Sequence, residues 1–150
     1  MKKLSIIIYP NPILLKKTKK IKNHLAPEIQ KLIPQMIEVM KKSNGMGLAA
    51  NQVGKFLRLC IIKEKEQNKI YILINPTITA FSRKKVVLQE GCLSFPQQFF
   101  SISRSEKIKV RFLDEQGEKV KIKAEGLLAR AIQHEVDHLD GIVFIERLKK

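Results

Sequence analysis

Tryptophan is absent from this sequence of 150 residues, and cysteine occurs only twice, as Cys60 and Cys92. Two cysteines cannot form the disulfide framework on which many small secreted domains depend. No apolar run approaches the roughly 20 residues that a membrane-spanning helix needs. The early run at residues 4–9 is stopped by Pro10 and is too short for the core of a signal peptide. These absences predict a cytoplasmic protein with free thiols and no membrane segment.

The sequence also lacks internal repeats, low-complexity tracts and any linker rich in Gly, Ser or Pro that would separate two domains. Hydrophobic residues make up 44% of the chain, which is enough for one substantial core at this length. We therefore expect a single domain over residues 1–150, and a monomer.

Acidic residues are few, because 14 Asp and Glu accompany 29 Lys and Arg and leave a net charge of +15. The excess lies mainly in residues 1–75, which hold 15 of the basic residues and 4 of the acidic ones. Five lysines fall between Lys16 and Lys22, and such a cluster can attract a polyanion such as ribosomal RNA. No aromatic residue interleaves with them as a platform for stacked bases would. A solvated surface is therefore the other interpretation of this cluster.

The clearest secondary-structure pattern lies in the last third of the chain. Apolar residues alternate with basic ones over residues 107–113 and again over 119–124, with a turn at 114–117 between them. This pattern predicts an antiparallel hairpin. From Gly126 the apolar spacing becomes helical, and Gly141 supplies a stop signal. Strands followed by a late helix predict an α+β fold.

The first half contains weaker signals. Short runs rich in β-branched residues predict strands at 57–63 and 70–75. A stretch with apolar residues at helical spacing predicts an amphipathic helix that ends just before Gly45. Pro34 lies inside that stretch, where a proline costs about 3 kcal/mol. The sequence leaves open whether the regular helix begins at Pro34, with residues 27–33 as a separate turn.

The predicted last helix carries two of the three histidines of the chain, His134 and His138. Residues four apart lie on the same face of a helix, so both imidazoles can bind one metal ion. Glu135 follows the first of them in the pattern H-E-x-x-H, beside the ion and suited to accept a proton from a water activated by the metal. His24 has no such partner, and we interpret it as an ordinary core or surface side chain.

A catalytic site of this kind takes three protein ligands and leaves one position for water. Cys92 is the best candidate for the third ligand, because its thiolate is a soft donor and the adjacent Gly91 allows close approach of the backbone. Cys60 lies in an apolar run and is better interpreted as a core residue.

Small residues dominate the segment from Gly45 to Gln52, which follows the first predicted helix. Such a loop exposes backbone groups to a ligand, and Gln52 adds a side-chain amide donor at its end. Bracing of the loop is the alternative role for Gln52.

Three segments resemble, in order and in residue type, the signature motifs of peptide deformylases: GMGLAANQ at 45–52, EGCLS at 90–94 and HEVDH at 134–138. The resemblance implies antiparallel β-sheets packed around a central helix that carries H-E-x-x-H. It also implies removal of the formyl group, with release of formate, from the N-terminal formyl-methionine of newly synthesised proteins.

The resemblance further implies roles for individual residues. Cys92, His134 and His138 would bind one divalent metal ion, natively often Fe²⁺, although Zn²⁺, Ni²⁺ or Co²⁺ can occupy such a site. Glu135 would act as base and then as acid. The Gln52 amide and the Leu93 backbone N–H would stabilise the oxyanion.

Substrate binding is expected at four positions. Leu127 and Ala131 precede His134 on the same helical face, where they can line a slot for methionine or simply pack in the core. The resemblance favours the slot and adds Met46 to it, with Gly47 offering its backbone to the substrate chain.

Several alternatives remain open at this point. A metalloprotease would share H-E-x-x-H, but it normally has a histidine or glutamate as third ligand. An RNA-binding protein would account for the net charge but not for the Cys, His and Glu set, and an inactive relative is a further alternative. Many bacterial relatives have a C-terminal helix that contacts the ribosome, whereas this sequence ends six residues past Phe144. We therefore expect any ribosome contact to use the basic N-terminal half.

Overall fold

The computed structural model describes residues 3–148 and contains two antiparallel sheets and two α-helices. The larger sheet has the strand order β1-β2-β3-β6-β7, and β4 and β5 pair separately as a long hairpin. The strands are β1 (Gly47–Ala49), β2 (Leu59–Glu64), β3 (Lys69–Phe81), β4 (Lys85–Cys92), β5 (Phe95–Ser105), β6 (Lys107–Leu113) and β7 (Lys119–Glu125). The helices are α1 (Pro27–Lys42) and α2 (Gly126–Leu139), with short 3-10 turns η1 (Pro12–Leu15), η2 (Ala50–Val53) and η3 (Phe144–Arg147).

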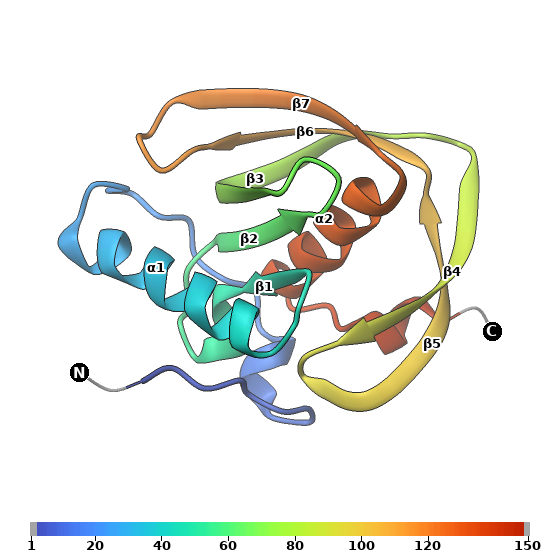
Figure 1. Ribbon diagram of the computed structural model, residues 1–150, viewed down its shortest axis with the longest axis horizontal. Helices are drawn as coiled ribbons and strands as arrows, with labels where there is room; N and C mark the ends of the chain where they lie inside the picture. The colour runs from blue at the N-terminus through green and yellow to red at the C-terminus, as the bar shows by residue number, and fades with distance from the viewer. Residues whose placement is uncertain (1–2, 149–150) are drawn as a thin grey trace.

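Helix α2 lies in the middle of the molecule, enclosed by the larger sheet and the β4–β5 hairpin, while α1 lies on the outside (Figure 1). Strand β2 explains this arrangement, since it is buried on both faces. Leu59 and Ile61 belong to the core cluster with α1, whereas Cys60 and Ile62 belong to the cluster with α2. Full burial of each leucine or isoleucine side chain contributes about 1.5–3 kcal/mol. The predicted α+β fold with a central helix is confirmed.

Helix α1 runs without interruption from Pro27 to Lys42 and includes Pro34, so the question left open by the sequence is answered. Pro34 lies on the exposed side, whereas Met36 and Met40 are buried. The backbone hydrogen bond that a proline cannot donate is therefore lost on the side that water can reach, and the buried face is sufficient to keep the helix together.

The predicted hairpin at 107–124 is confirmed as β6 and β7, and its turn is organised by Asp114. Oδ1 of Asp114 accepts hydrogen bonds from the backbone N–H groups of Gln116 and Glu118 at 3.0 and 2.9 Å. A carboxylate that accepts such local hydrogen bonds is typical of Asp in turns.

The two strands predicted in the first half are present, but their bounds differ. Strand β2 begins at Leu59 rather than at 57, and β3 continues to Phe81 instead of ending near 75. Asn75 marks the place where the prediction failed, because it has a positive φ of 53°. Its side chain bonds both the N–H and the carbonyl of Ile21 at 2.8 Å, so a strand irregularity is stabilised by a distant segment.

The β4–β5 hairpin was not predicted from the sequence. Its residues are mostly exposed along β4, so the apolar alternation that reveals a half-buried strand is weak there. Phe95 and Ile102 of β5 are buried with Phe144 in a separate cluster next to α2. The hairpin thus brings the Cys92 segment onto the helix.

Among the described residues, no helix is long and apolar enough to cross a membrane.

Candidate metal centre and active site

Helix α2 presents His134 and His138 side by side. The centroids of the two imidazole rings lie 4.9 Å apart, and both side chains are buried. This is the placement that the four-residue spacing predicted. The backbone carbonyl of His138 also accepts a 2.6 Å hydrogen bond from the side chain of Asn51, which ties the loop before β2 to the helix.

Cys92 reaches the same point from the end of β4. Its Sγ lies 3.2 Å from Nε2 of His138, and one ligand atom each from Cys92, His134 and His138 lie within 4.8 Å of one another. A thiolate and two imidazoles are the soft and borderline donors that transition metals prefer. The three predicted ligands therefore meet and fit a divalent transition-metal ion. Cys60, in contrast, is fully buried in the core, as predicted.

Glu90 holds the first histidine in position. Its Oε1 lies 2.9 Å from Nδ1 of His134, which leaves Nε2 of that ring for a metal. The same carboxylate accepts hydrogen bonds from Arg104 and from Arg130. The sequence did not predict a role for these residues in holding His134, although Arg130 precedes His134 by four positions and so shares its helical face.

A second carboxylate extends this buried network behind the helix. Asp137 accepts a 2.7 Å hydrogen bond from Arg104, and it also pairs with Arg147 in η3. Acidic and basic side chains alternate along this network. It connects Arg147, close to the end of the described residues, to the metal ligands. No pattern in the sequence could have paired residues 33 positions apart.

Glu135 points into the space beside the metal ligands. It is buried, and its Oε1 has no hydrogen-bond partner among the described residues. Burial raises its pKa from 4.5 to about 7, against the opposing charge of His134. A carboxylate whose pKa lies near neutrality is suited to accept and return a proton.

The two histidines differ in how they hold protons when no metal is bound. Burial alone would lower the pKa of His134, but Glu135, Cys92 and Glu90 outweigh it and raise the pKa to about 10. Burial and the neighbouring charge of His134 lower the pKa of His138 well below its usual value. Because metal ions bind the neutral imidazole, the raised pKa of His134 opposes metal binding as the pH falls.

Gln52 lies at the end of η2 and contacts both the loop and the site. Its Oε1 accepts a 3.0 Å hydrogen bond from the backbone N–H of Ala49. Its Nε2 donates to Ser94 Oγ at 3.1 Å and lies 3.6 Å from Cys92 Sγ. The Gln52 side chain therefore both braces the loop and places an amide donor next to the ligands.

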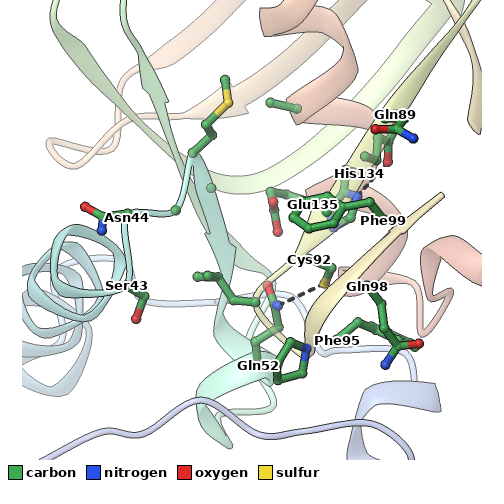
Figure 2. Close-up of a pocket in the computed structure, with 18 of the residues that line it drawn as sticks. Ser43, Asn44, Gln52, Gln89, Cys92, Phe95, Gln98, Phe99, His134 and Glu135 are labelled. Carbon is green, nitrogen blue, oxygen red and sulfur yellow. Dashed lines mark hydrogen bonds and ion pairs between the residues drawn. The ribbon is translucent and has the colours of Figure 1, made fainter. Parts of the chain in front are cut away.

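A cavity of about 500 Å³ opens over these residues. Figure 2 shows Gln52, Cys92, His134 and Glu135 converging on it from different elements. Leu127 is 60% exposed, so it is not an ordinary core residue. The other predicted residues that line the cavity are Met46, Gly47, Leu93 and Ala131. The predicted ligand His138 is not among the residues that line it.

Gly47 permits a close approach between the loop and the helix. A Cβ atom at this position would lie 2.6 Å from Oε2 of Glu135. Only glycine therefore allows the carboxylate to occupy its present position.

Known proteins match the chain along nearly its whole length. The family model described as polypeptide deformylase matches residues 3–150. A peptide deformylase from Thermodesulfovibrio yellowstonii is 45% identical over 148 residues, which are 97% of this chain and 88% of that protein. The one from Syntrophobacter fumaroxidans is 42% identical, over 97% of this chain and 86% of that protein.

Solved structures agree with these matches. The crystal structure of the peptide deformylase from Thermotoga maritima has a TM-score of 0.93 and 37% identity, and the match covers 100% of both chains. That of the Ehrlichia chaffeensis enzyme in complex with actinonin has a TM-score of 0.94 and 40% identity, over 100% of this chain and 91% of that one. This chain therefore belongs to the polypeptide deformylase family, the metal-dependent hydrolases that remove the N-formyl group from nascent proteins.

Proposed function

We propose that this deformylase holds one divalent metal ion with Cys92, His134 and His138, and that it acts on formyl-methionine in the adjoining cavity. The observation that carries this proposal is the meeting of one thiolate and two imidazoles within 4.8 Å of one another, beside a buried glutamate. A bound metal of this kind supplies a Lewis acid that polarises a carbonyl and makes water a better nucleophile at neutral pH.

Glu135 is the proton carrier of the reaction. Its carboxylate takes the proton of the attacking water and then delivers it to the nitrogen of the leaving amine, so that formate and a free N-terminus result. The raised pKa and the unpartnered Oε1 both support this role.

Two donors stabilise the negative charge that develops on the formyl oxygen, namely the Nε2 amide of Gln52 and the backbone N–H of Leu93. Both residues line the cavity, and Gln52 is held by its bonds to Ala49 and Ser94. Donors fixed in advance are worth about 2.7–4 kcal/mol each in comparable sites.

The methionine side chain occupies an apolar slot formed by Met46, Leu127 and Ala131, and the Gly47 backbone binds the substrate chain. Their positions around the same cavity support this assignment. The native metal is Fe²⁺ in this proposal, with Zn²⁺, Ni²⁺ or Co²⁺ as possible replacements, because a mixed Cys and His set accepts all of these ions.

The partners and the cellular compartment of the enzyme are inferred from its substrate. Formylated nascent chains are its partners, and the cytoplasm is the proposed compartment because such chains are made there. We keep a single catalytic domain over residues 1–150 and a monomer as predictions, together with a ribosome contact through the lysines at 16–22. All five of these lysines are exposed, which supports an electrostatic contact.

The test is formate release from formyl-Met-Ala-Ser by protein purified anaerobically with Fe²⁺ or Ni²⁺, next to Glu135→Ala. We expect about one bound ion per chain in both proteins and loss of at least 100-fold in kcat/KM in the variant. Bound metal without formate release would refute the assigned substrate, and cleavage of internal peptide bonds would then favour a metalloprotease.

A further inference from the structure

One face of the larger sheet is apolar where α1 covers it and cationic towards its β7 edge. The register places Leu59 opposite Ile74, Ile74 opposite Leu113, and Leu113 opposite Lys119, so these residues share one face. Leu59 and Ile74 are buried under α1, and Leu113 packs against the same cluster. Beyond Leu113 the same face continues onto β6 and β7, which α1 leaves uncovered (Figure 1).

The uncovered part of this face is cationic. We call it the basic ribbon, and its members are the exposed residues Lys107, Lys109, Arg111, Lys119, Lys121 and Lys123. Only Lys107 has an ion pair among the described residues, a 3.7 Å contact with Glu125 at one end of the ribbon.

Like charges face each other across the two strands of the ribbon. Lys109 lies opposite Lys123, and Arg111 lies opposite Lys121. Directly opposed like charges are destabilising in a sheet. Lysines on the edge strand β7 can serve to block pairing with other sheets, but β6 is an interior strand and has no edge to protect. The basic residues on β6 therefore call for another explanation.

An aromatic ring lies beside these charges. Phe81, at the end of β3, is 60% exposed and lies opposite Ile108 in the register. It lines a hollow together with Lys107, Lys109, Lys123 and Glu125. The combination of a cationic track and an exposed ring is what single-stranded nucleic acids use, with phosphates on the cations and a base stacked on the ring. The lysine cluster at 16–22 has no such ring within its sequence.

We propose that the basic ribbon, with Phe81, binds the phosphate backbone of single-stranded RNA. Cations on one strand recur every ~7 Å, which is two residues of an extended chain, and this is close to the separation of successive phosphates. RNA is the polyanion nearest to a nascent protein, since the nascent chain is still attached to the ribosome. An anionic membrane is less well matched, because a single exposed ring gives little apolar area to insert.

The proposal is tested with two variants that each remove four positive charges. The first is Lys109→Ser, Arg111→Ser, Lys121→Ser and Lys123→Ser together. The matched control is Lys16→Ser, Lys17→Ser, Lys19→Ser and Lys20→Ser together. The probe is a fluorescent uridine oligomer of about 20 nucleotides, whose anisotropy is followed in roughly 50–200 mM KCl.

The ribbon variant is expected to lose at least ~10-fold in RNA affinity, and the slope of log K against log salt should fall by about 3, as expected for four lost phosphate contacts. The control should keep its affinity for this free oligomer to within ~3-fold, because the lysines at 16–22, proposed above to contact the folded ribosome, have no ring beside them to hold a single strand. Phe81→Ala should lose roughly 5-fold or more with little change in slope. Equal losses in the two four-charge variants would show that net charge alone matters, and would overturn the proposal. So would RNA affinity that persists in the ribbon variant while binding to phosphatidylglycerol vesicles is lost.

Formate release from a short formylated peptide reports folding independently, because no ribbon residue lines the active-site cavity. Unchanged release is expected in all three variants. If the ribbon variant misfolds, the pair Lys109→Ser and Lys123→Ser provides the same comparison with a salt slope lowered by about 1.4. A failure of the proposed active-site roles would appear only in formate release, and a failure of RNA binding only in anisotropy.

Discussion

Oε1 of Glu90 lies 2.9 Å from Nδ1 of His134, while the same carboxylate is fixed by Arg104 and Arg130. The contact orients the ring so that Nε2 faces Cys92 and His138. When the ring is neutral, the contact also favours the tautomer with the proton on Nδ1, which leaves Nε2 free to bind a metal. Glu90 is therefore a positioning residue whose effect should be measurable in metal affinity.

Glu90→Gln should weaken metal binding by about 10- to 100-fold, because the neutral amide orients and polarises His134 less well. Titration with Ni²⁺ in competition with a chelator measures the affinity directly. Arg130→Met is the matched control, since it removes one partner of the same carboxylate and leaves the contact between Glu90 and His134 in place. Comparable losses of affinity in both variants would mean that the network acts through stability and not through His134.

The same carboxylate predicts a pH dependence of stability in the metal-free protein. Burial alone would raise the pKa of Glu90, but hydrogen bonds from His134 and Arg104 lower it from 4.5 to about 2. As the pH falls, the unfolded chain therefore takes up this proton first. The resulting stabilisation is complete above pH ~4.5 and is lost towards pH ~2, and it amounts to about 3 kcal/mol.

Urea unfolding between pH 6 and pH 2, roughly the range of these two ionisations, measures this contribution as the difference between the wild type and Glu90→Gln. The difference should shrink as the pH falls through that window. A difference that stays constant would show that Glu90 ionises normally in the folded protein.

Gly47→Ala should lower kcat by about 10- to 100-fold with little change in metal content. The new Cβ would lie 2.6 Å from Oε2 of Glu135, so the carboxylate must move, and small displacements of a reacting group have effects of this size. Gly45→Ala is the control in the same loop. There the Cβ would meet Cδ1 and Cγ of Leu93 at 2.7 and 3.3 Å, so this variant displaces the Leu93 side chain and not the carboxylate of Glu135. A similar loss of kcat in both variants would argue against a specific effect on Glu135.

The sequence revealed those parts of the site that depend on local spacing. His134 and His138 are four residues apart on one helix, and α2 and the β6–β7 hairpin have clear apolar periodicity. The family resemblance linked them to Cys92 and Gln52. The confirmed core position of Cys60 followed from its apolar neighbours alone.

What the sequence missed depends on contacts between distant segments. Arg104 joins Glu90 to Asp137 across 14 and 33 positions, and nothing in the spacing of these residues marks them as partners. The extension of β3 past Asn75 depends on bonds to Ile21, 54 positions away. Pro34 remains within α1 because the buried face of the helix outweighs one lost hydrogen bond, and such a balance is not visible in a local pattern.

Phe99 should influence which residue follows the formyl-methionine of a good substrate. The residue is 64% exposed at the rim of the cavity, and its ring lies over Gly91, where a Cβ would be only 2.7 Å from Cε1 of the ring. An exposed ring at the rim of the proposed substrate cavity offers contact to an apolar second residue and little to a polar one. Phe99→Ala should therefore lower kcat/KM for formyl-Met-Leu-Ser by roughly 3- to 10-fold and leave formyl-Met-Ser-Ser nearly unchanged.

Phe81→Ala is the matched control for this selectivity, because Phe81 is 60% exposed but lies outside the active-site cavity. It should alter neither substrate. The ratio of kcat/KM for the two peptides, measured by formate release, isolates the effect of the ring from any change in metal loading, since loading affects both peptides alike. If Phe99→Ala lowers both values by the same factor, the ring supports the architecture of the β4–β5 hairpin rather than substrate choice.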